Sequence, residues 1–377
     1  MGISLYIHIP FCTTKCRYCD FISYPAGKSH KFSEYIFALG REMELLSRQY
    51  GQIDVDTVYL GGGTPSLLPE THIKDILARI NSFFLLAKSA EITIEANPET
   101  LDKEKLATYR SLGINRLSIG AQTAANDLLA DMGRGHSWKD VINVTVWARE
   151  AGFTNIGLDL IYGLPGQSLT QWRKTLVQAA DIRPQHLSVY GLKLSPGTAW
   201  GDMEEAGQLV LPGDDEQAEM YLLARTFLAE RGYRHYEISN FALQGFEARH
   251  NLTYWKLRPY LGVGVAAASF MEHTRWTNSG SLAEYILNLK ERKLAREELL
   301  YLDDKEEMIE YMIMGLRLVE GISREDFFSR FHLSLEEIFG NKLASLTARD
   351  LLEEKQGRIF IPTEAFAVAN EVFVAFV

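Results

Sequence analysis

The feature of this chain that most restricts its fold is the alternation of short β-branched runs and amphipathic stretches before residue 200. Strands are predicted, in chain order, at residues 5–9, 57–60, 92–96, 116–119, 156–161 and 186–190. Helices are predicted between them at residues 33–48, 70–84, 103–111, 138–150 and 169–181. This alternation indicates parallel βαβ units, and therefore an α/β barrel or an open sheet. In such a barrel the functional residues lie at the carboxyl ends of the strands.

The pattern changes after about residue 195, where Pro-Gly turn signals appear. A helix is predicted at 216–230, and a further change near residue 302 begins a run of short helices. These helices are expected at 303–318, 324–331 with Ser323 as cap, 335–343 and 348–354, followed by a strand at 358–361 and a last helix capped by Thr363. The order suggests a winged-helix-like C-terminal domain. We therefore expect three units, at 1–200, 201–300 and 301–377.

Composition narrows the class of protein. A chain of 377 residues exceeds what one hydrophobic core usually covers, so more than one domain is expected. The net charge of -10 argues against a general nucleic-acid-binding surface. The first residues lack the basic and apolar regions of a secretory signal, and no stretch is apolar enough to span a bilayer. We expect a protein of the reducing cytoplasm, where disulfides are rare.

All three cysteines of the chain fall in one window, Cys12-Thr13-Thr14-Lys15-Cys16-Arg17-Tyr18-Cys19, directly after the first predicted strand. Three thiolates at this spacing can hold three irons of a [4Fe–4S] cluster. Because the chain has no fourth cysteine, one iron would stay open to a ligand that is not protein. Two alternatives remain: a zinc site with His8 or Asp20 as fourth ligand, or ordinary thiols in a reducing compartment.

A glycine run, Gly61-Gly62-Gly63, continues into Thr64-Pro65-Ser66 between the second predicted strand and its helix. Glycines there allow the backbone to approach a ligand closely. The cysteine window and this run together resemble the radical S-adenosylmethionine (SAM) proteins. That resemblance implies that SAM binds the open iron through its amino and carboxylate groups, and that the glycine run contacts the SAM amino group.

Polar residues near later strand ends are candidates for the rest of a SAM pocket. Glu95 can accept hydrogen bonds from two ribose hydroxyls, as acidic residues do in dinucleotide sites. Gln122, Arg134 and Asp159 are placed to complete the pocket.

Four segments carry a closer resemblance that covers nearly the whole chain: Tyr6-Ile7-His8-Ile9-Pro10-Phe11-Cys12, the GGGTPS run, Glu95-Ala96-Asn97-Pro98 and Gly133-Arg134-Gly135-His136. They resemble the coproporphyrinogen III dehydrogenase-like branch, which contains oxygen-independent coproporphyrinogen III oxidases and HemW-type heme chaperones. The resemblance implies a partial (β/α)6 barrel followed by a mainly helical C-terminal domain. It implies SAM contacts at Tyr6, Gly62, Gly63, Thr64, Glu95, Gln122, Arg134 and Asp159.

Two departures separate the chain from the oxidases of this branch. The oxidases carry a further cysteine two positions after the third of the window, where this chain has Phe21. They also carry an N-terminal extension, whereas this chain reaches its window at Cys12. Both favour a heme carrier over a coproporphyrinogen oxidase, without deciding whether the chain is also an enzyme. The implied partners are heme and an acceptor hemoprotein; a transient membrane-associated partner and the oligomeric state stay open.

The segment Arg249-His250-Asn251-Leu252-Thr253-Tyr254-Trp255 resembles the HNxxYW element of the branch. A neutral histidine is a common axial heme ligand and a tyrosinate is another, so His250 and Tyr254 are the candidate heme ligands. An aromatic seam between domains is the alternative reading. Relatives commonly have a Gly-Ala-His-Ser element where this chain has Gly262-Val263-Gly264-Val265-Ala266-Ala267-Ala268-Ser269, so a histidine that could line the site is missing.

Overall fold

A computed structural model describes residues 2–26 and 30–377 of the chain. Its centre is a run of six parallel strands, each hydrogen-bonded to the next in chain order. These strands are β1 (Ile3–Ile9), β4 (Asp54–Gly62), β5 (Leu85–Ala96), β6 (Arg116–Gln122), β7 (Ile156–Tyr162) and β8 (His186–Gly191). Each contains one of the six predicted strands, so the predicted α/β alternation is confirmed.

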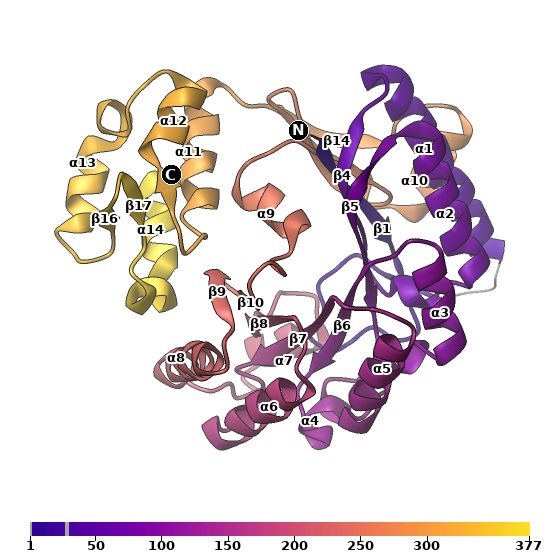
Figure 1. Cartoon of the computed structure of the whole chain (residues 1–377), viewed down its shortest axis with the longest axis horizontal. Coiled ribbons are helices and arrows are strands. Elements are labelled where there is room, and N and C mark those ends of the chain that lie inside the picture. Colours follow the sequence, from indigo (N-terminus) through magenta and orange to yellow (C-terminus); the bar gives the residue numbers. More distant parts are fainter. Residues whose placement is uncertain (1, 27–29) are drawn as a thin grey trace.

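The helices between these strands cover the outer, convex side of the curved sheet (Figure 1). They are α1 (His30–Tyr50), α2 (Glu70–Phe83), α3 (Lys103–Ser111), the short α4 (Asn126–Asp131), α5 (Trp138–Glu150) and α6 (Leu169–Ile182). Local sequence fixes where several of them begin: Asp102 caps α3, and Ser137 and Ser168 form capping boxes at α5 and α6. Their buried faces join the strands in one large hydrophobic core.

Later segments extend the sheet at both ends. Strand β10 (Asn240–Ala242) pairs antiparallel with β8, and β9 (Arg234–Glu237) pairs antiparallel with β10. Helix α8 (Asp214–Glu230) packs on α6. Beside β1 lie β11 (Tyr260–Val263), β12 (Ala268–Met271), β13 (Thr274–Asn278) and β14 (Arg296–Tyr301). Because β9 and β14 are opposite edges of one sheet, the parallel strands form a partial barrel, as expected.

Three helices accompany these added strands: α7 (Ala199–Glu205), α9 (Arg249–Trp255) and α10 (Leu282–Lys290). Helix α10 packs on α1, whereas α9 lies on the inner side of the sheet and contacts β4 (Figure 1). This position puts the HNxxYW element inside the barrel.

The C-terminal unit has the strand and helix order of a winged helix. Its elements are α11 (Asp304–Gly315), β15 (Ile322–Ser323), α12 (Arg324–Phe331), α13 (Leu335–Thr347), β16 (Glu353–Lys355), β17 (Arg358–Phe360), a 3-10 helix at Thr363–Val368 and α14 (Ala369–Phe376). The three strands form a small sheet in the order β15-β17-β16, and a separate hydrophobic core lies beneath them. This unit meets the barrel through an antiparallel bridge between Glu237 and Leu318, and through contacts of α11 with α9 and of the 3-10 helix with α8.

One predicted helix of this unit is wrong, and the last helix begins later than predicted. Helix α13 continues to Thr347, and the predicted helix at 348–354 is instead a turn followed by β16. The backbone of Asp350 adopts a left-handed φ of 56°, which reverses the chain and lets Leu351 and Leu352 enter the core. The last helix starts at Ala369, after the 3-10 helix that begins at Thr363.

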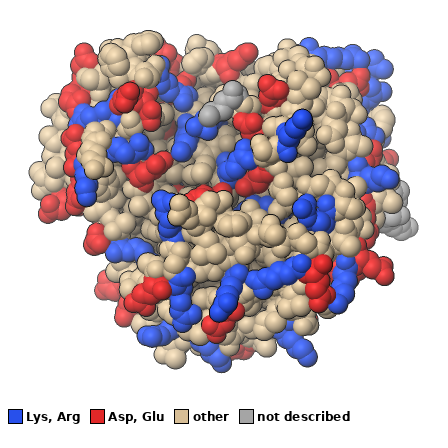
Figure 2. Space-filling model, viewed as in Figure 1, with Lys and Arg blue, Asp and Glu red and all other residues tan. Residues whose placement is uncertain are grey.

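Acidic and basic side chains are intermixed over the face shown in Figure 2. Among residues 2–26 and 30–377, no helix is both long and apolar enough to cross a membrane.

Candidate cluster and cofactor site

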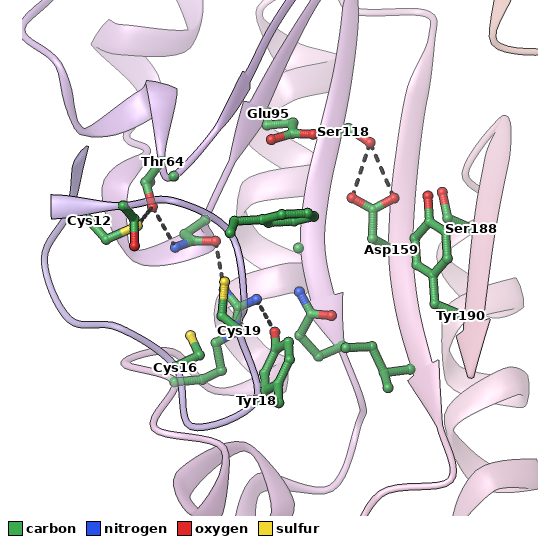
Figure 3. Close-up of a pocket in the computed structure, with 18 of the residues that line it drawn as sticks. Cys12, Cys16, Tyr18, Cys19, Thr64, Glu95, Ser118, Asp159, Ser188 and Tyr190 are labelled. Atoms are coloured by element: carbon green, nitrogen blue, oxygen red, sulfur yellow. Dashed lines mark hydrogen bonds between the residues drawn. The ribbon is translucent and has the colours of Figure 1, made fainter. Parts of the chain in front are cut away.

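A cavity of about 400 Å³ opens at the carboxyl ends of β4 to β8. Its wall contains all three cysteines, and its floor carries polar side chains from successive strands (Figure 3). The cavity has the size of a site for one small ligand. The cavity therefore lies where parallel strands end, the place at which the sequence predicts the functional residues.

The cysteine loop is anchored at both ends. Cys12 lies on the short strand β2 (Phe11–Cys12), which pairs with β3 (Tyr24–Pro25), and the amide of Ala26 donates to the carbonyl of Cys12 at 2.8 Å. Between the strands, the amide of Cys19 donates to the carbonyl of Cys16 at 3.2 Å, which forms a turn. The three half-buried thiols are thus presented on a loop held against the barrel.

The donor set fits an iron–sulfur cluster. All three cysteines lie at the wall of the cavity, where each thiolate can bind a different iron of a cubane and the fourth iron stays open. Burial raises the pKa of Cys16, and the nearby Arg134 opposes this effect by favouring the thiolate.

Glu95 is the buried carboxylate at the end of β5. It accepts hydrogen bonds from the Tyr59 hydroxyl at 2.8 Å and from the Gly62 amide at 3.0 Å. Burial raises the pKa of Glu95 to about 7, although both hydrogen bonds oppose this effect. The carboxyl group is therefore poised between its charged and neutral forms near neutral pH.

Asp159 is the second buried acid of the cavity and lies on β7. The Ser118 hydroxyl lies 3.2 and 3.1 Å from its two carboxylate oxygens. Burial raises its pKa, opposed by a hydrogen bond from Ser188 and by the charge of Arg116. Both acids point into the cavity (Figure 3), where they can accept from ligand hydroxyls or attract a cation.

Six of the eight predicted SAM residues line the cavity. These are Gly63, Thr64, Glu95, Gln122, Arg134 and Asp159. Tyr6 and Gly62 lie beside it: Tyr6 hydrogen-bonds His8 at 3.0 Å, and Gly62 donates to Glu95. Gly62 has a φ of 111°, and a Cβ there would lie 2.6 Å from the His8 ring, so this position requires glycine.

Sequence reasoning missed several residues of the cavity floor. They are Tyr59, Arg116, Ser118, Ser188 and Tyr190. A usable signal existed on β6, where Arg116, Ser118, Gly120 and Gln122 alternate along one face of the strand. Because Gln122 was expected in the pocket, every second residue before it could have been expected there too.

His250 lies on α9 beneath the cavity and is 1% exposed. Both of its ring nitrogens are within hydrogen-bond distance of a hydroxyl: Nδ1 is 2.8 Å from Thr57 and Nε2 is 2.8 Å from Tyr254. Burial lowers the pKa of His250 to about 3, so the ring is neutral. The ring also stacks on Tyr59 at 5.0 Å, while its neighbour Asn251 lines the cavity. Heme ligation by His250 or Tyr254 stays a prediction, and it would require this pair to separate.

The segment that lacks the expected histidine lies outside the wall of the cavity. Residues 262–269 span the end of β11, the turn that follows it and the start of β12, and Glu42 accepts a hydrogen bond from the Gly264 amide at 2.8 Å. None of these residues lines the cavity that contains the cysteines.

Comparison with known proteins shows the family of this chain. The radical SAM superfamily matches residues 6–179, and the HemN C-terminal domain matches residues 302–368. The heme chaperone HemW of Bacillus subtilis is 38% identical over 374 residues, which cover 99% of this chain and 98% of the relative. The chain belongs to the HemW family. HemW of Lactococcus lactis is 35% identical and covers 99% of this chain and 97% of the relative.

A solved structure shares the whole fold. Coproporphyrinogen III oxidase HemN from Escherichia coli superposes with a TM-score of 0.88 over 100% of this chain and 90% of HemN, at 24% identity. At this identity the likeness shows the fold. Membership of the HemW family and of the radical SAM superfamily implies a [4Fe–4S] cluster and SAM, and the cysteines and polar wall of the cavity fit both.

Proposed function

We propose that this protein is a heme chaperone that binds heme and transfers it to acceptor hemoproteins while carrying a SAM-ligated [4Fe–4S] cluster. The observation that carries this proposal is full-length similarity to proteins named heme chaperone HemW, at 38% identity for the Bacillus subtilis relative. The proposal includes the expected division at 1–200, 201–300 and 301–377 and a reducing cytoplasm as the working compartment. A transient membrane-associated partner belongs to it as one class of acceptor.

In this proposal the cluster binds to Cys12, Cys16 and Cys19, and SAM occupies the polar cavity beside them. When bound, the cluster supplies an open iron for the amino and carboxylate groups of SAM. The residues of the chain bind and orient SAM: Glu95 accepts from its ribose, and the glycine run allows its amino group to approach the backbone. Tyr6, Gln122, Arg134 and Asp159 complete the proposed contacts.

The second candidate is an oxygen-independent coproporphyrinogen III oxidase, which the fold shared with HemN favours. Phe21 argues for the carrier. It stands where the oxidases have a further cysteine, and it is 64% exposed at the rim of the cavity. An exposed aromatic side chain can contact a flat apolar ligand but cannot serve as a thiol.

One anaerobic preparation tests both functions. Heme titration followed by mixing with an apo-hemoprotein should give binding and then transfer, read from the Soret band. The same sample with SAM, a reductant and coproporphyrinogen III should form no protoporphyrinogen at enzyme-like rates. Product formation at such rates would overturn the carrier proposal, and so would failure of the wild type to bind heme.

A further inference from the structure

Four hydrogen bonds connect the aromatic residue of the cysteine window to the first cysteine. Arg134 donates from Nη2 to the Tyr18 hydroxyl at 2.5 Å and from Nη1 to the Asn97 Oδ1 at 2.8 Å. The Asn97 Nδ2 donates to the Thr64 Oγ1 at 3.3 Å, and the Thr64 hydroxyl donates to the Cys12 Sγ at 3.6 Å. Dashed lines in Figure 3 follow this chain from Tyr18 to Cys12.

We call these four hydrogen bonds the relay. The donors and acceptors of the side chains allow only one orientation of the hydrogen bonds in it. A guanidinium has donors and no acceptor, so the amide oxygen of Asn97 must face Arg134. The amide nitrogen of Asn97 must then face Thr64, whose oxygen accepts from it. The one hydroxyl hydrogen of Thr64 is left to point at the sulfur of Cys12. Arg134 therefore decides, through Asn97, which way the Thr64 hydroxyl points.

Burial and a backbone hydrogen bond hold Thr64 close to the sulfur of Cys12. Thr64 is 4% exposed, and its amide is held by the Phe11 carbonyl at 2.8 Å. A Cβ on Gly63 would lie 3.0 Å from the Cys12 Sγ, so glycine is needed for this approach of the two loops. Because Thr64 is buried, water competes little for its hydroxyl, and its hydrogen bond to sulfur is stronger than in solution.

We propose that Thr64 tunes the cluster at its Cys12 corner, and that Asn97 and Arg134 are positioning residues that aim its hydroxyl at the sulfur. Hydrogen bonds to cluster sulfurs are among the factors that set reduction potential. A donor at Cys12 stabilises the reduced cluster, which carries more negative charge, and so raises the potential. This inference rests on the cluster of the proposed function and is independent of heme.

The test is a redox titration of the reconstituted cluster in the absence of SAM, monitored by electron paramagnetic resonance. Thr64→Val keeps the shape of the side chain and removes the hydroxyl, so the potential should shift to more negative values. Thr64→Ser keeps the hydroxyl and should stay closer to the wild type. Thr93→Val is the matched control, because Thr93 is a fully buried threonine of β5 outside the cavity wall. It should leave the potential unchanged, and iron and sulfide content checks that every variant holds its cluster.

Asn97→Leu tests the direction of the relay. It should shift the potential in the same direction as Thr64→Val but by less, because the freed hydroxyl points at sulfur for part of the time. In the double variant the Asn97 change should add nothing, since the Thr64 hydroxyl through which it acts is gone. Equal potentials in wild type and Thr64→Val, or additive shifts in the double variant, would overturn the relay and leave the proposed function standing. A wild type that assembles no cluster would overturn both.

Discussion

The barrel contains two regions that sequence motifs mark as ligand sites, and the structure treats their polar groups differently. In the cavity beside the cysteines, Glu95 and Asp159 line open space. On α9, His250 is instead hydrogen-bonded to Tyr254 through Nε2 and to Thr57 through Nδ1. A motif gives the residue types of a site, but the distribution of hydrogen bonds decides whether those groups are free for a ligand.

The two regions also differ in the free energy needed to make their polar groups available to a ligand. A buried polar group that loses its partner costs about 1–3 kcal/mol. Glu95 and Asp159 can accept from a ligand through their remaining lone pairs while keeping their own hydrogen bonds, whereas an iron bond to either ring nitrogen of His250 must first break the hydrogen bond at that nitrogen. The cavity is therefore ready to bind, and the α9 pair is a closed arrangement that has to open.

The largest expected effect is on cluster content, which should depend on the cysteines and not on α9. Cys16→Ala should abolish the stable cluster, because two remaining thiolates cannot hold three irons. Iron and sulfide should fall from about four each per chain to near zero in an anaerobic preparation. His250→Ala should keep full cluster content, since α9 contributes no cysteine. A cluster that survives in Cys16→Ala would show that the window is not the site.

Much of this contrast could be read from the sequence, and part of it could not. Strand ends and glycine runs are local patterns, so the positions of Gly63, Glu95 and Asp159 around one cavity followed from βαβ order alone. The burial of His250 did not, because it depends on α9 entering the barrel from residues far along the chain. Helix α9 is held there by Glu91, which accepts from the amides of Arg249 and His250.

The next largest expected effect is on SAM binding in the cavity beside the cysteines. Glu95→Ala should weaken SAM binding by about 1.5–3 kcal/mol, roughly 10- to 150-fold, through loss of charge-assisted hydrogen bonds. In the wild type, burial raises the pKa of Glu95 to about 7, so SAM affinity should rise as pH increases through that value and the carboxylate forms. Calorimetry or SAM-induced changes in the cluster spectrum, recorded from pH 6 to pH 8, would measure both.

A matched control exists for the pH dependence. Glu42 lies on α1 outside the cavity, and burial also raises its pKa to about 7. Glu42→Gln should therefore leave the pH profile of SAM binding unchanged, while Glu95→Gln should flatten it. A profile that follows Glu42 instead would mean that stability, and not the SAM pocket, titrates in this range.

The smallest expected effect is on heme affinity, and it tests whether His250 separates from Tyr254. If His250 ligates heme after separating from Tyr254, Tyr254→Phe weakens the closed pair by about 1 kcal/mol and should raise heme affinity roughly fivefold. His250→Ala should lower heme affinity and shift the Soret band, with cluster content intact.

The two variants also distinguish the ligands from each other. A tyrosinate ligand predicts the opposite result for Tyr254→Phe: lower affinity and a shifted Soret band. Such a ligand has an added cost, because burial raises the pKa of Tyr254 far above its usual value and must be relieved before the phenol ionises. If both variants keep the wild-type affinity and spectrum, α9 has a structural role: its histidine supports Tyr59, which in turn holds Glu95. In that case His250→Ala should instead weaken SAM binding, and the two regions would act as one site.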